Sequence, residues 1–252
     1  MSPVETIPLI AHRGYAARFP ENTREALAAA VAAGARFVEF DIQLSADRVP
    51  FLFHDEDFAR TAGVDSRIMD MDAAEVVAID VGEAERFGDA FRGIRAPRLA
   101  DVVADLAGWE AVTAFVELKR QSIEHFGLET VLDAVLPVLQ PVIERSVIIS
   151  FDPEAVFDAR RRTNCRIGLA LRAWDADHFE AANDLQPDYL FCNVLRLPPP
   201  SEPLWRGPWT WVVYEITDPG QARQLAARGV DIMETMAYGE LAAGLAAAGE
   251  AL

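Results

Sequence analysis

The sequence predicts an α/β fold, a TIM (β/α)₈ barrel, and three observations carry that prediction. Short apolar runs rich in β-branched and aromatic residues alternate with alanine-rich helical stretches from one end of the chain to the other. Repeated strand–helix units indicate a parallel sheet with helices outside it, and 252 residues suit one closed barrel of eight strands. No low-complexity tract, long linker or repeat interrupts the pattern, so we expect one domain over residues 1–252.

More runs have the composition of strands than a barrel of eight needs. They are residues 8–12, 37–44, 50–54, 114–119, 146–151, 166–171, 189–194, 211–216 and 231–235. Only residues 45–49 join the second run to the third, which is too short for a helical crossover and predicts an antiparallel β-hairpin. One of these two runs, or the terminal one, is then an irregularity on the barrel.

Helical segments are expected between the strands, among them residues 23–33, 128–139, 153–162 and 221–228. The first has a start signal, with Asn22 as the N-cap and Glu25 three residues later, and Gly34 ends it. Residues 55–96 have weak periodicity, many acids and several glycines. They predict a small insertion after the third strand and are a candidate lid.

The charge of the chain is strongly acidic, with 40 acidic against 23 basic residues and a formal net charge of −17. We therefore expect neither nucleic acid nor a stable membrane surface as a partner, because both are bound through Lys and Arg. A small-molecule phosphate would need a local cationic site inside this acidic shell.

Several sequence features bear on the location of the protein. No run of about 18 apolar residues predicts a membrane-spanning helix, and residues 1–8 lack a signal-peptide pattern. Cys165 and Cys192 are too few for a disulfide framework and are not spaced as a zinc site. We expect both to be buried thiols and the location to be cytoplasmic.

Four strand ends carry polar side chains that do not belong in an apolar core. They are His12-Arg13, Glu39 with Asp41, His54-Asp55, and Glu117 with Lys119. Residues two apart in a strand point to the same face, so each of the two spaced pairs projects into one side of the sheet.

These side chains suggest a metal site with acid–base groups beside it. Glu39, Asp41 and Glu117 form a hard-oxygen ligand set suited to one Mg²⁺ or Ca²⁺. The alternative for each acid taken singly is an ion pair with Arg13 or Lys119.

Histidine is the side chain suited to proton transfer near neutral pH, and His12 and His54 face a common site as a candidate base and acid. Asp55 either orients the ring of His54 or makes a helix or loop contact. We expect His125 and His178 at the surface.

Taken in order, these residues resemble the signature of the glycerophosphodiester phosphodiesterase family, within the PLC-like phosphodiesterase superfamily. The motifs are Ile10-Ala11-His12-Arg13-Gly14, Pro20-Glu21-Asn22-Thr23, Glu39-Phe40-Asp41, His54-Asp55, Val116-Glu117-Leu118-Lys119 and Ser150-Phe151-Asp152. The likeness is strong up to about residue 152 and weak from there to residue 235. The motifs are specific as a set, although each alone is common.

The resemblance implies a TIM barrel and the metal-dependent hydrolysis of a glycerophosphodiester to glycerol 3-phosphate and an alcohol. In such enzymes a hydroxyl of the substrate's glycerol can attack phosphorus, and water then opens the cyclic phosphate. The implied metal ligands are Glu39, Asp41 and Glu117. His12 and His54 are implied as the acid–base pair, and we take His12 as base and His54 as acid.

Further residues are implied as substrate contacts. Arg13 and Lys119 would contact the phosphate, while Glu21 and Asn22 would shape the pocket, Asn22 also capping the first helix.

The sequence departs from the family near its C-terminus. A Trp-Thr-Val-Asn run is replaced by Tyr214-Glu215-Ile216-Thr217, and the final Thr-Asp by Thr235-Met236. We expect Tyr214 to form an aromatic wall, and Glu215 either to favour a cationic headgroup or to face solvent. Residues 197–209, rich in proline and tryptophan, either line the mouth of the site or pack under the barrel rim.

Two other functions stay open at this point. A lysophospholipase D or sphingomyelinase D-like enzyme acting on lipid would need an apolar or basic docking loop, which the net charge of −17 disfavours. A catalytically silent barrel that binds a phosphodiester would lack a metal ligand or a histidine, and none is missing.

Overall fold

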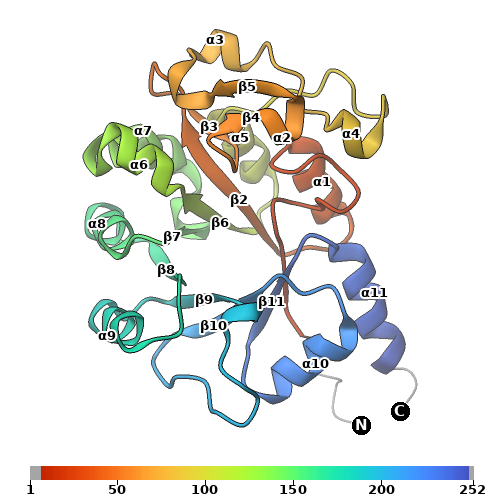
Figure 1. Cartoon of the computed structure of the whole chain (residues 1–252), viewed down its shortest axis with the longest axis vertical. Helices are drawn as coiled ribbons and strands as arrows, with labels where there is room; N and C mark the ends of the chain where they lie inside the picture. Colours follow the sequence, from red (N-terminus) through yellow and green to blue (C-terminus); the bar gives the residue numbers. More distant parts are fainter. Residues whose placement is uncertain (1–6, 250–252) are drawn as a thin grey trace.

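The computed structural model describes residues 7–249 and confirms the predicted barrel (Figure 1). Eight parallel strands close a ring in the order β1-β2-β6-β7-β8-β9-β10-β11, with β11 paired back to β1. They are β1 (Leu9–Ala11), β2 (Phe37–Leu44), β6 (Thr113–Leu118), β7 (Ser146–Ser150), β8 (Arg166–Leu171), β9 (Tyr189–Asn193), β10 (Thr210–Tyr214) and β11 (Ile232–Thr235). The expectation about a signal peptide falls mainly on residues 1–6, which lie outside the described residues.

A further strand lies outside the ring and forms the predicted hairpin. β3 (Pro50–Leu52) pairs antiparallel with β2, with Leu52 opposite Ile42. Because β3 runs back along β2, the chain returns to the barrel mouth, where the Phe53 amide donates to the Asp41 carbonyl at 3.0 Å. His54 therefore reaches the mouth although its strand is not part of the ring.

Helices cover the outside of the ring, as expected for repeated strand–helix units. They are α1 (Arg24–Ala32), α5 (Leu99–Gly108), α6 (Arg120–Phe126), α7 (Leu128–Leu139), α8 (Pro153–Thr163), α9 (Ala176–Leu185), α10 (Pro219–Ala227) and α11 (Tyr238–Gly249), with short 3₁₀ turns η2 (Gln140–Arg145) and η3 (Val194–Arg196).

The start of α1 differs from the prediction in one residue. Thr23, not Asn22, is the N-cap, and its hydroxyl accepts from the Ala26 amide at 3.1 Å. Asn22 has a positive φ of 55° and turns its side chain toward the barrel mouth instead. The predicted cap was wrong by one position because threonine and asparagine are both good caps.

The inside of the barrel is packed with buried apolar side chains from every strand of the ring except β2, which contributes the partly buried Phe37. The buried cluster consists of Ile10, Phe115, Val147, Ile149, Ala170, Phe191, Val212 and Ile232. Phe115 contacts Phe191 edge-on, with ring centroids 5.7 Å apart. Gly168 makes room for this packing, since a Cβ there would lie 2.6 Å from Ile149 and 2.8 Å from the Phe191 ring.

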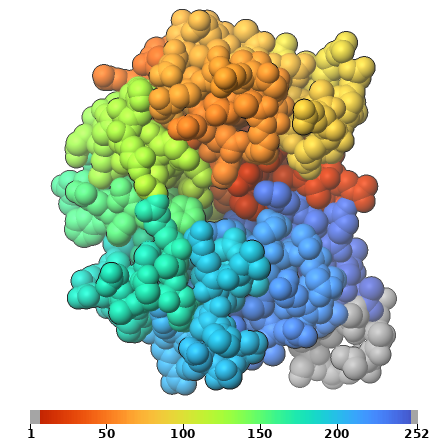
Figure 2. All heavy atoms as spheres, viewed as in Figure 1, coloured from red at the N-terminus to blue at the C-terminus, as the bar shows by residue number. Residues whose placement is uncertain are grey.

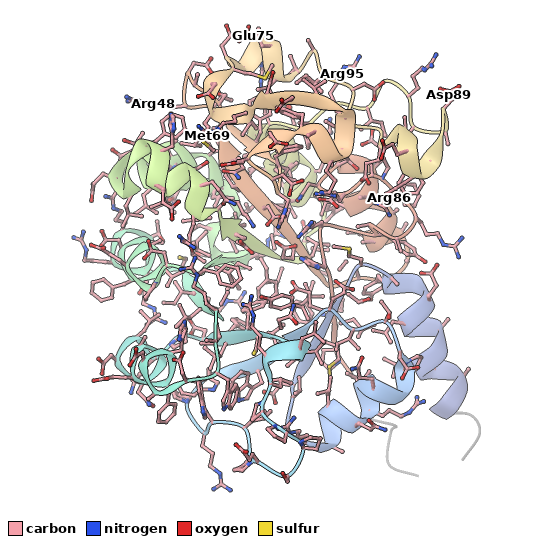
Figure 3. The ribbon with its side chains drawn as sticks, in the orientation of Figure 1. Arg48, Met69, Glu75, Arg86, Asp89 and Arg95 are labelled. Atoms are coloured by element: carbon pink, nitrogen blue, oxygen red, sulfur yellow. The ribbon has the colours of Figure 1, made fainter. Side chains whose placement is uncertain are left out.

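Residues 55–96 form a separate layer against the β2–β3 hairpin and pack around a small apolar cluster that they share with Phe51 and Phe53. They contain β4 (Asp57–Phe58), α2 (Ala59–Ala62), β5 (Val64–Arg67), η1 (Ile68–Asp70), α3 (Ala73–Val76) and α4 (Ala84–Phe87). In the space-filling view they make a continuous block, coloured orange to yellow, above the rest of the molecule (Figure 2). Glu75, Asp89 and Arg95 lie on the outer rim of this block (Figure 3).

Within residues 7–249, no single helix is long and apolar enough to cross a membrane. One pair, Arg120–Phe126 with Leu128–Arg145, meets the length and composition criteria together but is bent by 120°. Cys165 and Cys192 are both buried and free.

Candidate active site

The carboxyl ends of the ring strands surround a pocket of about 90 Å³. Its lining residues are His12, Arg13, Glu39, His54, Glu117, Lys119, Ile149, Phe151, Ala170, Phe191, Tyr214 and Glu234. Charged groups come from β1, β2, β6, β11 and the hairpin, whereas the side formed by β7, β8 and β9 is apolar. The pocket therefore brings together both predicted histidines, both predicted cations and two of the three predicted metal ligands.

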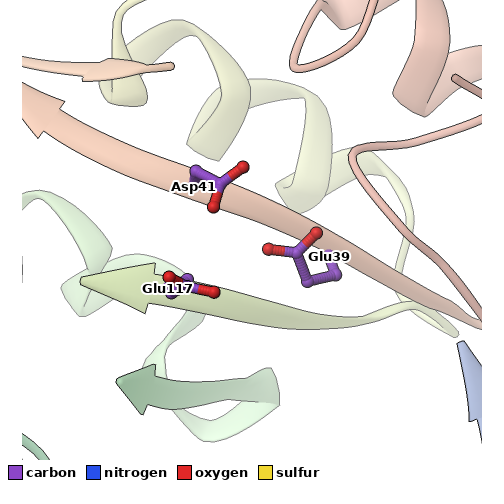
Figure 4. A group of neighbouring side chains, drawn as sticks. All are labelled: Glu39, Asp41 and Glu117. Atoms are coloured by element: carbon purple, nitrogen blue, oxygen red, sulfur yellow. The ribbon is translucent and has the colours of Figure 1, made fainter. Parts of the chain in front are cut away.

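The three predicted metal ligands form one cluster at this mouth (Figure 4). Each of Glu39, Asp41 and Glu117 offers an oxygen, and these oxygens all lie within 4.8 Å of one another. Glu39 and Asp41 project side by side from β2, opposite Glu117 on β6, because Asp41 and Glu117 are paired in register. This arrangement is the one that two-residue spacing on neighbouring parallel strands dictates.

The electrostatics of the cluster fit a bound cation. Burial and the nearby Asp41 raise the pKa of Glu39 well above its usual value. Oε1 of Glu39 is buried and has no hydrogen-bond partner. A buried, unpartnered carboxylate oxygen beside two further acids is costly unless a cation occupies the site, so the donor set fits a hard divalent ion.

Asp41 is the acid that the protein itself neutralises. Burial alone would raise the pKa of Asp41, but Lys119 and Arg13 outweigh burial and hold that pKa well below its usual range. Lys119 Nζ lies 3.2 Å from Asp41 Oδ1 and forms an ion pair with it, although the angles are not those of a hydrogen bond. The same Nζ lies 2.9 Å from Glu117 Oε1. Asn22 donates to Asp41 Oδ2 at 2.8 Å. The carboxylate is thus fixed in orientation by three neighbours.

Arg13 contacts three acids at the barrel mouth, Glu39, Glu21 and Asp41. It follows β1 with a positive φ of 55°, and its amide donates to Glu39 Oε2 at 2.9 Å. Its guanidinium pairs with Glu21 at 2.9 Å and lies 3.2 Å from Asp41. Gly14 follows, with a φ of 76°, where a Cβ would lie 2.6 Å from the Ala26 backbone. Only glycine lets the loop lie this close to α1.

His12 is anchored by an acid that the sequence did not assign to it. Its Nδ1 lies 2.7 Å from Glu215 Oε2, while Glu215 Oε1 accepts from the Met236 amide at 2.6 Å. A carboxylate can only accept, so Nδ1 carries the proton and Nε2 is the nitrogen left for the pocket, 3.8 Å from Glu39 Oε2. Glu215 therefore orients His12, a role that neither sequence-based alternative included, and its side chain is 30% exposed.

The acids around His12 also set its charge. Burial lowers the pKa of His12, but Glu234, Glu215 and Glu39 outweigh burial and raise it to about 9. The surrounding acids therefore stabilise the imidazolium form of His12. The assignment of His12 as base and His54 as acid stays a prediction.

His54 is anchored in the same way from the other side of the site. Its Nδ1 lies 2.6 Å from Asp55 Oδ1. Of the two alternatives for Asp55, this contact is the one in which Asp55 orients the ring of His54. Arg60, in α2, donates to Asp55 Oδ2 at 2.6 Å and to both oxygens of Glu21 at 2.6 and 3.0 Å. A chain of charge-assisted hydrogen bonds thus connects residues 55–96 to His54 and to Arg13.

Of the remaining predicted residues, Tyr214 lines the pocket and the segment 197–209 does not. The ring centroid of Tyr214 lies 6.1 Å from that of His12. In the segment, Trp205 stacks on Trp174 at 4.0 Å and Trp209 is buried in the outer core, which is the packing alternative.

The histidines expected at the surface lie away from the site. His125 is exposed, and His178 is half-buried at the start of α9, where it contacts Asp175.

Sequence reasoning missed three residues of the site, namely Arg60, Glu215 as an anchor, and Glu234. Glu234 was hidden because it lies within an apolar run at the end of the chain. The spacing offered one signal, since Glu234 is two residues beyond the inward-facing Ile232 of the same strand.

The fold and the site together define an α/β-barrel protein with an acidic, metal-compatible pocket flanked by two anchored histidines. The chain matches the model of the glycerophosphoryl diester phosphodiesterase family over residues 12–233, and it belongs to that family.

Individual relatives agree with the family match. The chain is 29% identical to glycerophosphodiester phosphodiesterase 1 of Homo sapiens over 190 residues, which cover 75% of this chain and 55% of that protein. It is 32% identical over 162 residues to glycerophosphodiester phosphodiesterase of Caldanaerobacter subterraneus subsp. tengcongensis, with 64% and 65% covered. The chain thus spans about half the length of the mammalian relatives it matches.

Solved structures share the fold over nearly the whole chain. A putative glycerophosphoryl diester phosphodiesterase from Silicibacter pomeroyi has a TM-score of 0.82 at 24% identity, covering 97% of this chain and 94% of that one. An Oleispira antarctica phosphodiesterase, in complex with the product sn-glycerol-3-phosphate, has a TM-score of 0.81 at 21% identity, covering 95% and 96%. At these identities the likeness concerns the fold.

Proposed function

We propose that this protein hydrolyses a glycerophosphodiester to glycerol 3-phosphate and an alcohol. The observation that carries the proposal is the convergence of three clustered carboxylates, two cations and two histidines on one small pocket. Membership of the family supports the same reaction. The product named for the Oleispira antarctica structure is the one proposed here.

A divalent cation, Mg²⁺ or Ca²⁺, is part of the proposal. Glu39, Asp41 and Glu117 would hold it, and the unpartnered Oε1 of Glu39 supports this assignment. When bound, such an ion polarises the phosphoryl oxygens and lowers the pKa of an attacking hydroxyl. The acids Glu39, Asp41, Glu117 and Glu234 outnumber the cations Arg13, Lys119 and protonated His12, so an anionic substrate needs this added positive charge.

The two histidines transfer the protons. Both have Nδ1 engaged by a carboxylate, so both have Nε2 free for the substrate. One takes the proton from the attacking hydroxyl, and the other gives a proton to the oxygen of the departing alcohol. Arg13 and Lys119 offset the charge that builds on the phosphoryl oxygens.

The other assigned residues shape the pocket. Glu21 holds Arg13, Asn22 holds Asp41, and Tyr214 forms one wall. Residues 55–96 support His54 through Arg60, and their role as a lid stays a prediction.

The wider assignments rest on the sequence. We take residues 1–252 as one domain that acts in the cytoplasm on a small molecule. Neither nucleic acid nor a stable membrane contact belongs to the proposal, because the net charge of −17 disfavours both.

Glycerol 3-phosphate release from a panel of glycerophosphodiesters tests the proposal. The panel is assayed with Mg²⁺, with Ca²⁺ and with a chelator, alongside a His12→Ala variant purified in parallel. We expect release that needs a divalent ion and that the variant loses. Absence of release from every diester, by a folded protein that binds the metal, contradicts the proposal.

A further inference from the structure

Glu234 is a buried acid whose carboxyl makes no hydrogen bond to another residue between 7 and 249. It lies on β11 with its side chain inside the barrel, where it is 3% exposed. Its Oε1 is buried without a hydrogen-bond partner, and its carboxyl makes no ion pair with any residue between 7 and 249. Buried polar atoms are almost always paired, so an unpaired one beside a pocket is available to bond a molecule that enters the pocket.

The position of Glu234 places this oxygen at the floor of the active site. In register it lies beside Ile10 of β1, two residues below His12, and Tyr214 is at the same level on β10. The side chains of Glu234, His12 and Tyr214 line the same pocket. The wall beyond Tyr214 is formed by Phe191 and Ala170, whose side chains have no donor to offer.

Glu234 does not belong to the predicted metal site. Within the described part of the chain, the one group of three acids or histidines close enough to share an ion is Glu39, Asp41 and Glu117. Glu234 is not a member of that group. Its free oxygen is therefore available to a molecule that enters the pocket with a hydrogen-bond donor.

The chemistry of that donor follows from the environment. Burial raises the pKa of Glu234 to about 7, so near neutral pH much of the carboxyl is uncharged, and an uncharged carboxyl both donates and accepts. A hydroxyl matches this pattern. A quaternary ammonium headgroup has no N–H and would leave the oxygen unpaired.

We propose that Glu234 forms a hydrogen bond with a hydroxyl of the substrate's glycerol group and thereby selects diesters that carry this hydroxyl. The inference rests on the proposed function and names the contact by which that pocket recognises its substrate. A site built to bond a hydroxyl discriminates strongly against the analogue that lacks it, because its own polar group is then buried unpaired.

A cycle of enzyme variants and substrate analogues tests the contact. Two diesters share an ethyl ester as the leaving group, which has no hydroxyl of its own. The first carries glycerol. The second carries 1,2-propanediol, which keeps the central hydroxyl that can attack phosphorus and lacks the terminal one. kcat/KM is measured for wild type, Glu234→Leu and Glu234→Gln at saturating Mg²⁺.

We expect Glu234→Leu to lower kcat/KM for the glycerol diester by roughly 10- to 100-fold. The same substitution should have almost no further effect on the 1,2-propanediol diester, which lacks the terminal hydroxyl that Glu234 would bond. Glu234→Gln keeps a donor and an acceptor and should recover part of the loss. Thermal unfolding should show neither variant less stable, because each removes a buried unpaired acid.

Glu215→Gln is the matched control. This carboxyl lies on the chain just after the neighbouring strand, but it acts on the substrate only through His12, so its loss should lower kcat/KM by one common factor for all active diesters. A common factor for Glu234→Leu as well, or no effect, would overturn the inference while leaving the proposed function intact. Failure of wild type on the glycerol diester would overturn both.

Discussion

Arg60 is the residue by which the block of residues 55–96 reaches the active site, and its removal tests how much that contact matters. Its guanidinium donates one hydrogen bond to Asp55 and two to Glu21. Arg60→Ala leaves Glu21, whose side chain is only 6% exposed, with Arg13 as its one remaining cation. Asp55 keeps only its contact with His54.

The free energy of unfolding lost in Arg60→Ala follows from how deeply each of its contacts is buried. A hydrogen bond to a charged group contributes about 1.5–3 kcal/mol when it is buried, and an exposed ion pair at most about 1 kcal/mol. Arg60 is 47% exposed and Asp55 25%, so that pair contributes about 0.5 kcal/mol. Glu21 is buried but keeps Arg13 as a partner, so its pair with Arg60 contributes about 1.5 kcal/mol. Together they give about 2 kcal/mol, which corresponds to a loss of roughly 4–8 °C in Tm.

Activity should fall for a separate reason. With Asp55 no longer held by Arg60, the ring of His54 is less precisely oriented, and we expect kcat to fall by about tenfold. The metal concentration needed for half-maximal activity should not change, because Arg60 contacts none of the three clustered acids.

Thermal unfolding and steady-state kinetics of Arg60→Ala, Asp55→Asn and the double variant provide the assay. Arg60→Lys serves as the control that keeps the charge but not the forked geometry, and it should lie between Arg60→Ala and wild type. Additive effects of the two single substitutions on kcat would show that Arg60 does not act through Asp55 and would refute the reasoning.

Three further predictions concern the histidines, the metal and pH. His12→Ala and His54→Ala should each lower kcat by at least about 10²-fold with an unchanged unfolding temperature, and near-normal turnover in either would remove that residue from catalysis. Glu117→Gln should raise the Mg²⁺ concentration for half-maximal activity by about tenfold or more; an unchanged requirement would exclude Glu117 as a ligand. Burial raises the pKa of Asp55, but hydrogen bonds from His54 and Arg60 outweigh burial and hold it well below its usual value. Its contribution to stability is therefore present above its unfolded pKa of about 4 and is lost as pH falls below that value. The Tm difference between wild type and Asp55→Asn should shrink in acid, and a constant difference would contradict this.

Much of the fold could be predicted because its signals are local. The strand and helix periodicities, and the five-residue link between the second and third strand runs, were enough to predict a barrel with an antiparallel hairpin. The cap of α1 was missed by one residue, since the choice between Asn22 and Thr23 depends on Asn22 being drawn to Asp41, a residue on another strand.

The site residues that depend on a local pattern could be predicted, and those that depend on long-range contacts could not. Glu39, Asp41 and Glu117 were predicted to converge because side-chain alternation and parallel register fix their directions. The anchors could not be predicted in this way. Glu215 reaches His12 across 203 positions of sequence, and Arg60 reaches Glu21 across 39. Such contacts depend on how the ring closes and on how the block of residues 55–96 lies, which no local pattern encodes.

The pocket is lined by charged groups on one arc of the barrel and by apolar groups on the other. The side chains of Ile149, Phe151, Ala170 and Phe191 bind no ligand oxygen and hold neither histidine. Mutation can therefore reshape this arc while the reacting groups stay in place. A gene copy under selection for a different alcohol could change these four positions gradually, with every intermediate still able to break the same bond. The division of the wall thus gives the protein a route to new substrates that does not pass through an inactive form.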